Sequence, residues 1–369
     1  MSTQTATQRA YNFSAGPAVL PETVLERIRD EMLCLPGVGA SILEISHRSA
    51  AFVEILNDAR DRFRSVFAVP DSHEIVFLQG GACLQNAMIP ANLMVDQNQT
   101  ADYIVTGAWG KKSAAEVSRF GKLHHAWNGD SENFSRLPAP RELDYSNDAA
   151  YVHFTSNETI HGVQFSNEPD TGGVPLVSDM SSDILCRPVD VSRYGLIYAC
   201  AQKNSGVAGL TVVVIHRDLL DRSSDRLPLY LNYAKHVAGD SMVNTPPTFA
   251  VYVLGLVCRW LQEDIGGLEK MRAINEQKSS ILYDVIDNSG GFYRGHARPQ
   301  DRSIMNIVFT TPNPEFDKQF LDQAAAANMI TLKGHRSLGG IRASTYNAMP
   351  AEGVATLAAF MKDFANNNG

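Results

Sequence analysis

The sequence predicts an α/β fold: a large domain with a mostly parallel sheet and a small α+β C-terminal domain. Up to Ile215, short apolar runs alternate with helical stretches, which is typical of a doubly wound sheet. Beyond Gly290 the order of strands and helices changes. The 369 residues allow about two domains. We expect a flexible tail over residues 1–10, a large domain over residues 11–262 and a small domain over residues 263–369.

Apolar periodicity predicts two helices near the N-terminus. Residues 21–32 are expected to be helical, with Pro21 near the start, where its fixed φ suits a first turn. A loop rich in glycine and proline follows at residues 35–39. Residues 49–67 form the next expected helix, because apolar side chains recur there at spacings of three and four. These side chains are Phe52, Ile55, Leu56, Ala59 and Phe63.

The strands of the expected sheet are short apolar runs. They lie at residues 74–78, 102–106, 151–155, 175–178, 195–201 and 210–215. Helices are expected between the first of these strands, at residues 82–93 and 111–120. Parallel strands need a crossover connection of this kind, so the alternation favours parallel pairing.

The C-terminal part is expected to be rich in helix. A long helical stretch over residues 247–287 is interrupted by Gly266 and Gly267. The small domain then continues as a strand, a helix, a strand pair around Gly339-Gly340 and a final helix. These elements are expected at residues 303–311, 314–329, 331–346 and 350–366.

Composition and charge exclude several classes of protein. Hydrophobic residues make up 44% of the chain, which is ordinary for a globular protein with a large core. A formal net charge of −8 argues against nucleic acid or an anionic membrane as the main partner. The first ten residues lack the apolar segment of a signal peptide. The five cysteines are scattered without metal-like spacing, so we expect a cytoplasmic protein with no metal site.

Lys203 is the first candidate for a functional residue. It follows the apolar run 196–201, and another apolar run begins at Leu210. An ammonium group between two buried strands loses water at a cost in free energy. Chains tolerate that cost when the amine must be neutral and nucleophilic, and Schiff-base formation with a carbonyl group is the leading reason.

Asp179 makes pyridoxal phosphate the expected cofactor. This aspartate ends another apolar run, residues 174–178. A lysine can hold the aldehyde of pyridoxal phosphate, and a carboxylate keeps the ring nitrogen protonated so that the ring can act as an electron sink. Lys203 and Asp179 both follow strands, and open α/β sheets bind ligands beyond the carboxyl ends of their strands.

Three further candidates follow strands of the same sheet. The turn Gly80-Gly81-Ala82 could hold a phosphate on backbone amides at a helix N-terminus. The indole of Trp109 could stack on a pyridine ring, and the hydroxyl of Thr159 could bond the phenolic oxygen of that ring.

Each candidate also has a purely structural interpretation. A Gly-Gly turn is more often plain turn chemistry, a lone tryptophan after a strand usually belongs to the core, and Thr159 or Asp179 could serve only a helix cap. For Lys203 alone, a solvated turn lysine remains the commoner case. The joint pattern outweighs these alternatives, because five candidates of matching chemistry follow successive strands.

Motifs from about Tyr11 to Phe364 belong to one pattern. They are Asn12-Phe-Ser-Ala-Gly-Pro17, Ser46-His47-Arg48, Asn157-Glu-Thr-Ile160, Pro188-Val-Asp-Val-Ser-Arg-Tyr-Gly195, Ala201-Gln-Lys-Asn204, Asn244-Thr-Pro-Pro-Thr248, Gly334-His-Arg336 and Arg342-Ala-Ser-Thr-Tyr-Asn-Ala-Met-Pro350. In these motifs the chain resembles the phosphoserine aminotransferase family, within the class V aminotransferases. The resemblance implies the PLP-dependent transferase fold of the aspartate aminotransferase type (fold type I) and a homodimer.

The resemblance implies that Lys203 holds the cofactor aldehyde and that Asp179 pairs with the ring nitrogen. The other implied contacts of pyridoxal phosphate come from both subunits of the homodimer. They are the stacking Trp109, the ring-oxygen partner Thr159, the phosphate neighbour Gln202, the helix-start residues Ala82 and Cys83, and Asn244 and Thr245, which would reach the cofactor phosphate of the partner subunit.

The resemblance also implies substrates with two anionic ends, phosphoserine and glutamate. Arg342 would hold the α-carboxylate of either one. His47 and Arg48, with His335 and Arg336 from the neighbouring subunit, would bind the distal anion. Bidentate arginines suit both groups, and histidines add donors. Either His-Arg pair alone would more often be a solvated surface dipeptide.

The implied activity is a reversible ping-pong transamination of 3-phosphohydroxypyruvate with glutamate, which feeds serine biosynthesis. Bacterial members of the family can also aminate 3-hydroxy-2-oxo-4-phosphooxybutanoate on the route to pyridoxal phosphate. The chain departs from some relatives at Ala82-Cys83, where they carry Gly-Arg, and at Ala15, where they carry serine. The first departure removes a possible cationic contact near the substrate phosphate.

Two other functions compete with this interpretation. A cysteine desulfurase shares the fold but needs a nucleophilic thiol late in the chain, and no cysteine follows Cys258. A non-catalytic metabolite-binding protein on the same scaffold would not need Lys203, Asp179 and Arg342 together. A half-reaction with glutamate, followed by cofactor absorbance, separates a transaminase from such a protein.

Overall fold

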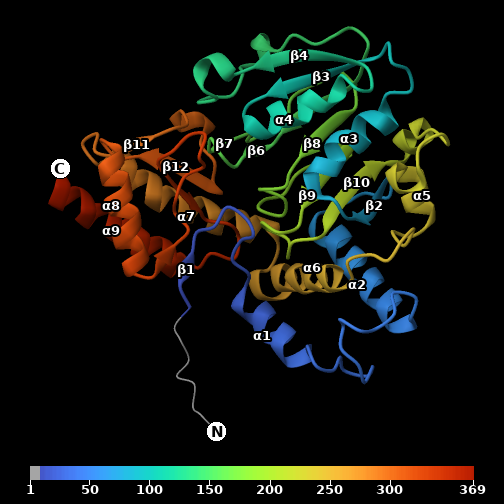
Figure 1. The fold of residues 1–369 in the computed structure, drawn as a ribbon, viewed down its shortest axis with the longest axis horizontal. Helices are drawn as coiled ribbons and strands as arrows, with labels where there is room; N and C mark the ends of the chain where they lie inside the picture. The colour runs from blue at the N-terminus through green and yellow to red at the C-terminus, as the bar shows by residue number, and fades with distance from the viewer. Residues whose placement is uncertain (1–8) are drawn as a thin grey trace.

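A seven-stranded sheet forms the centre of the computed structural model, which describes residues 9–369. Its strands are β2 (His73–Leu78), β3 (Thr100–Val105), β4 (Lys122–Asn128), β5 (Ala149–Thr155), β8 (Leu176–Asp179), β9 (Leu196–Cys200) and β10 (Thr211–His216). They lie in the order β2-β10-β9-β8-β5-β3-β4 (Figure 1). Within this sheet β10 pairs antiparallel with β2 and β9, and the other pairs are parallel. The expected mostly parallel α/β sheet is therefore confirmed.

Helices cover both faces of this sheet (Figure 1). They are α1 (Glu22–Glu31), α2 (Ala50–Val66), α3 (Gly81–Leu93), α4 (Ala108–Val117), α5 (Tyr233–Ala238) and α6 (Thr248–Trp260). Along β2, Ile75 and Phe77 pack in one cluster with α1, α2 and α6, whereas Val76 and Leu78 pack in another with α3 and α4. A strand that is apolar on both faces needs both layers of helices.

The C-terminal part builds a second unit with its own hydrophobic cluster. Its elements are α7 (Leu268–Asp287), β11 (Arg294–Gly295), β12 (Asn306–Thr310), α8 (Pro314–Ala326), β13 (Met329–Ile330), β14 (Ile341–Ser344) and α9 (Ala351–Asn368). The N-terminal strand β1 (Tyr11–Asn12) pairs in parallel with β13, and Phe13 is buried in this cluster. The first described residues thus pack on the C-terminal unit. The domain limit after residue 262 stays a prediction, and residues 1–8 of the expected tail lie outside the described residues.

Several strands differ from the sequence-based expectation. The strand β4 is not among the expected strands, because this edge strand buries only Ala126 fully and its sequence contains no apolar run. The expected strand pair over residues 331–346 is confirmed only as a short antiparallel contact, in which the Gly334 amide donates to Gly340 and the Arg342 amide donates to Leu332. The strand β13 pairs with β1 and β14 pairs with β12, while an isolated bridge joins Lys333 to Ile341. The pairing of such short strands depends on tertiary packing and not on local sequence.

The expected break in the long C-terminal helical stretch is confirmed. A π-helical turn, Leu261–Ile265, follows α6, and α7 begins at Leu268. Between them Gly266 and Gly267 have φ values of 85° and 101°, which cost glycine less than any other residue. No helix in residues 9–369, α6 included, is long and apolar enough to cross a membrane.

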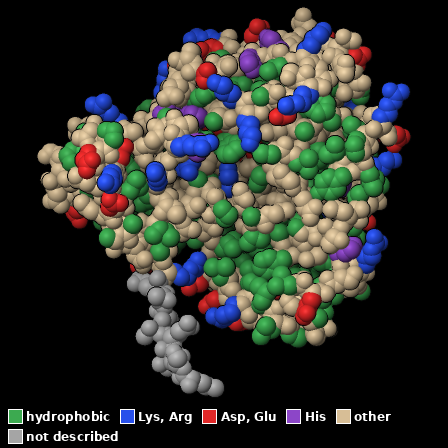
Figure 2. All heavy atoms as spheres, in the orientation of Figure 1, with side chains coloured by type: hydrophobic (Ala, Val, Ile, Leu, Met, Phe, Trp, Pro, Cys, Tyr) green, Lys and Arg blue, Asp and Glu red, His purple; other side chains and the backbone are tan. Residues whose placement is uncertain are grey.

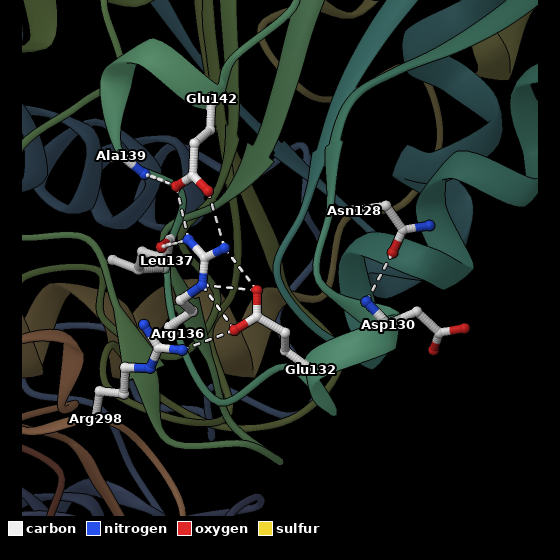
Figure 3. A network of polar contacts seen from close by, with 8 residues as sticks. All are labelled: Asn128, Asp130, Glu132, Arg136, Leu137, Ala139, Glu142 and Arg298. Carbon is white, nitrogen blue, oxygen red and sulfur yellow. Dashed lines mark hydrogen bonds and ion pairs between the residues drawn. The ribbon is translucent and has the colours of Figure 1, made fainter.

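An ion-pair network joins the segment after β4 to the segment that carries β11 (Figure 3). Arg136 donates to Glu132 at 2.8 Å and to Glu142 at 2.6 Å. Arg298 donates to Glu132 at 2.8 Å from the C-terminal unit. Arg136, aided by the Ala139 amide, lowers the pKa of Glu142 to about 2. A single exposed ion pair contributes little to stability, but this network connects the two units of the chain.

Lys278 is buried in α7, with 1% of its surface exposed. Its Nζ donates to the carbonyl oxygens of Tyr346, Asn347 and Met349 at 2.8, 3.3 and 3.2 Å. Burial lowers the pKa of this amine to about 7. The three hydrogen bonds hold the loop that leads from β14 to α9.

Replacing Lys278 with methionine is expected to lower the free energy of unfolding by about 2–4 kcal/mol, because three carbonyl groups lose a common donor. Urea unfolding followed by circular dichroism measures the change. Lys318→Met on the exposed surface of α8 is the matched control and should change stability by less than about 0.5 kcal/mol. A Lys278→Met protein as stable as the control would contradict the structural role.

Candidate active site

A cavity of about 250 Å³ lies where the parallel strands end. Thr155 of β5, Asp179 of β8 and Cys200 of β9 are the last residues of their strands, and all three line this cavity. Open α/β sheets bind ligands at this position. Nine residues singled out from the sequence also line the cavity: Ala15, Ala82, Trp109, Thr159, Asp179, Gln202, Lys203, His335 and Arg342.

Lys203 lies in the loop between β9 and β10. Its Nζ donates a hydrogen bond to Thr159 Oγ1 at 2.9 Å and lies 5.6 Å from the centre of the Trp109 ring. Gly16 packs closely on this side chain, because a Cβ at that position would lie 3.3 Å from Lys203 Cγ. Within residues 9–369 no carboxylate lies within 4.0 Å of the amine. The amine is therefore not engaged in an ion pair and is available to a carbonyl group.

Asp179 presents a buried carboxylate to the cavity. It is 7% exposed, and one of its oxygens accepts a hydrogen bond from the Ser181 amide at 2.8 Å. Burial raises the pKa of this carboxyl group, while the bond from Ser181 and the charge of Lys203 act in the opposite direction. A protonated ring nitrogen in contact with the carboxylate would offset the cost of burying it.

Two helices begin beside the cavity, and they are capped differently. The helix α3 begins at Gly81, and its N-cap residue Gly80 has no side chain to cap the first turn. Ala82 in that turn lines the cavity, so backbone amides there can bind an anion. The helix α4 begins at Ala108, and the carboxylate of Glu158 accepts hydrogen bonds from the amides of Trp109 and Gly110. A phosphate is thus expected at α3 and not at α4.

The side chains that line the cavity fit pyridoxal phosphate. Lys203 offers an amine for the aldehyde, and Asp179 offers a carboxylate for the ring nitrogen. Trp109 offers an aromatic surface, and Thr159 offers a hydroxyl for the ring oxygen. The hydroxyl of Thr155 is buried without a hydrogen-bond partner in the described part of the chain, so a polar ligand group can satisfy it.

Arg342 and His335 bring positive charge to the same cavity. Arg342 lies on β14, and its Nη1 donates to the carbonyl oxygen of Thr159 at 3.4 Å. Burial lowers the pKa of Arg342. The pKa of His335 is lowered mainly by burial and further by the charges of Arg342 and Arg336. His335 lines the cavity of its own protomer, because its loop leads directly into β14, and its implied contribution from the neighbouring subunit stays a prediction.

The other predicted site residues lie outside the lining of this cavity. They are His47, Arg48, Cys83, Asn244, Thr245 and Arg336. Asn244 donates to the side chain of Gln79 at 3.1 Å, and the Thr245 carbonyl accepts from Gln79 at 3.3 Å. Arg48, Asn244, Thr245 and Arg336 are exposed to solvent. Their functional roles stay predictions.

A lysine from α4 lies beside Cys83, where some relatives carry an arginine. Lys112 Nζ is 3.1 Å from Cys83 Sγ and 5.7 Å from the centre of the Trp109 ring. The start of α3 therefore has a cation next to it although its own sequence supplies none.

Sequence reasoning missed seven uncharged residues of the cavity. They are Gly16, Thr155, Asn157, Ile160, Ser181, Ser182 and Cys200. Cys200 Sγ accepts a hydrogen bond from the Ala82 amide at 3.1 Å. Cys200 and Thr155 each end a strand, which is the signal that could have identified them. Ala15 lines the cavity as expected for a backbone contact, and its carbonyl accepts from the Tyr346 hydroxyl at 2.9 Å.

Comparison with known proteins gives a consistent result. The family model "Aminotransferase class-V" matches residues 10–357. A phosphoserine aminotransferase of Rhodopirellula baltica is 52% identical over 362 residues, which cover 98% of this chain and 96% of the relative. A phosphoserine aminotransferase of Herpetosiphon aurantiacus is 48% identical over 359 residues, covering 97% and 99%.

Solved structures are similar over the whole length. The phosphoserine aminotransferase of Bacillus circulans subsp. alkalophilus matches with a TM-score of 0.96 at 45% identity, covering 98% of this chain and 100% of that chain. A PLP-bound phosphoserine aminotransferase from Trichomonas vaginalis matches with a TM-score of 0.89 at 38% identity, covering 96% and 100%. The expected fold type is therefore confirmed.

Proposed function

The chain belongs to the class-V aminotransferase family, and we propose that it is a phosphoserine aminotransferase. It transfers the amino group of glutamate to 3-phosphohydroxypyruvate, giving O-phosphoserine and 2-oxoglutarate, in a reversible reaction that serves serine biosynthesis. The observation that carries this proposal is that Lys203, Asp179 and Arg342 line one cavity in a chain 52% identical to a phosphoserine aminotransferase.

Pyridoxal phosphate, when bound, supplies an electron sink for the negative charge that develops at the α-carbon of the amino acid. Lys203 would hold the cofactor through its Nζ and, once released, would take the proton from the α-carbon of the substrate. Thr159 Oγ1 accepts from this amine at 2.9 Å and would fix its position. The buried Asp179 would hold the proton of the ring nitrogen.

Substrate recognition would rest on positive charge at both ends of the substrate. Arg342 is half-buried and can donate two parallel hydrogen bonds to an α-carboxylate. His335 lines the same cavity and can donate to the distal phosphate or carboxylate. His47, Arg48 and Arg336 would complete the distal pocket across a subunit interface.

The proposed assembly is a homodimer with composite active sites. Asn244, Thr245 and Arg336 are exposed and lie outside the cavity lining of their own protomer, as expected if they serve a partner subunit. Leu33 and Leu43 are 87% and 63% exposed in the loop region after α1. Figure 2 shows hydrophobic side chains gathered over the region where Figure 1 places α6. A second subunit would cover such a surface, and sedimentation measures the assembly.

The proposed location is the cytoplasm. All five cysteines are free, in agreement with a reducing compartment. Two of them, Cys34 and Cys83, are exposed.

The substrate assignment is tested by single half-reactions of the holoenzyme. Phosphoserine and glutamate should each change the absorbance spectrum of the bound cofactor. Alanine should do so at least about 100-fold more slowly, because it lacks a distal anion. Amino acceptors are then added to the aminated enzyme to compare 3-phosphohydroxypyruvate with 3-hydroxy-2-oxo-4-phosphooxybutanoate. No spectral change with either phosphoserine or glutamate would instead support a metabolite-binding protein.

A further inference from the structure

Glu158 is a fully buried carboxylic acid beside the cavity, with 0% of its surface exposed. One of its oxygens accepts from the Gly110 amide at 2.8 Å, and the other accepts from the Trp109 amide at 3.2 Å. These amides belong to the first turn of α4, whose N-cap residue Gly107 provides no side chain. Glu158 thus replaces the missing cap from a segment 48 residues away in sequence.

Gly107 makes room for this carboxylate. A Cβ at position 107 would lie 2.3 Å from the carboxyl carbon of Glu158, which is closer than any real contact. The φ of Gly107 is 177°, an extended value that other residues also adopt, so the requirement for glycine comes from close approach and not from backbone strain. The glycine and the glutamate fit together as a pair.

We propose that Glu158 is a positioning residue that fixes the first turn of α4 and thereby holds the indole of Trp109 ready to stack on pyridoxal phosphate. This inference rests on the proposed function. Glu158 also adjoins Thr159, whose Oγ1 accepts from Lys203. The same short segment therefore orients two groups. Glu158 orients the Trp109 indole through α4, and the Thr159 hydroxyl orients the amine of Lys203.

The cost of burying this acid argues that it does more than cap a helix. Burial raises the pKa of Glu158 to about 7, although the Gly110 and Trp109 amides and Lys203 lower it, and Asp179 raises it further. Serine, threonine or aspartate at the N-cap would satisfy the same amides without burying a longer acid. The Glu158 carboxylate instead ties the helix to the segment that holds Thr159.

The test compares Glu158→Gln and Glu158→Ala with wild type in the cofactor-free and cofactor-bound protein. Glu142→Gln is the matched control, because Glu142 also accepts a hydrogen bond from a backbone amide, that of Ala139 at 2.6 Å, but its neighbours in the sequence do not line the cavity, whereas Thr159 beside Glu158 does. Equilibrium dialysis measures the dissociation constant of pyridoxal phosphate. Near-ultraviolet circular dichroism of the cofactor-free protein, with Trp109→Phe as the reference, reports the environment of the indole.

We expect Glu158→Ala to raise the dissociation constant of pyridoxal phosphate about 10-fold and to abolish the Trp109 contribution to the dichroism, with a smaller effect for Glu158→Gln. The control should match wild type. Unchanged dichroism and a dissociation constant within about twofold of wild type in both variants would overturn the proposal. If Glu158→Ala does not fold, Glu158→Gln and Gly107→Ala give the same readouts. If wild type binds no pyridoxal phosphate, the proposed function fails, whereas the dichroism still tests how Glu158 positions Trp109.

Discussion

Replacing Lys203 with alanine is expected to reduce transamination at least about 10⁴-fold. Positioned proton transfer alone accounts for about 10²–10⁴-fold in enzymes, and Lys203 would also hold the cofactor covalently. The protein should still fold, because this half-buried side chain makes one hydrogen bond, to Thr159 Oγ1, among the described contacts. Asp179 and the backbone amides at the start of α3 should still bind pyridoxal phosphate without a covalent bond.

Lys112→Ala is the matched control for this variant. Lys112 Nζ lies 5.7 Å from the centre of the Trp109 ring, and Lys203 Nζ lies 5.6 Å from it, but Lys112 is exposed and does not line the cavity. Borohydride reduction followed by mass spectrometry should attach pyridoxal phosphate to Lys203 in wild type and in Lys112→Ala, and to no lysine in Lys203→Ala. Full turnover by Lys203→Ala would refute the assignment of the nucleophile.

Most of the central sheet can be predicted from the sequence because buried parallel strands are continuous apolar runs. The strands β9 and β10 are examples, because all their residues except the last one of each strand are buried. The edge strand β4 could not be predicted in the same way, because four of its seven side chains are polar and only Ala126 is buried. The pairing of β1 with β13 depends on contacts more than 300 residues apart, which no local pattern contains.

Some residues of the candidate site can likewise be predicted from the sequence, and others only from the fold. Lys203 and Asp179 can be found in the sequence because each places a charged group directly beyond an apolar run. Glu158 cannot, because a glutamate between an asparagine and a threonine resembles an ordinary cap, and only the fold shows that it caps α4. The position of His335 in the cavity lining likewise depends on how the loop before β14 folds, which the motif around it does not indicate.

Replacing Arg342 with alanine is expected to lower kcat/KM by about 100-fold for phosphoserine and for glutamate alike. Losing a charge-assisted contact to a carboxylate in a half-buried site costs about 3 kcal/mol, and every 1.4 kcal/mol is a factor of ten. Both substrates carry the same α-carboxylate, so the loss should be equal. Arg342→Lys should recover part of the activity, because it keeps the charge but not the paired donors. Steady-state kinetics with each substrate measures the effect.

Arg336→Ala is the informative comparison, because this exposed residue is assigned to the distal anion. It should impair phosphoserine more than glutamate, since the phosphate carries more charge than the carboxylate, and it should leave the reaction of alanine unchanged. Arg342→Ala, in contrast, should impair alanine as well, because alanine retains the α-carboxylate. Equal and negligible effects of both substitutions on all three amino acids would contradict the division of roles between the two arginines. A loss confined to phosphoserine in Arg342→Ala would instead place Arg342 at the phosphate.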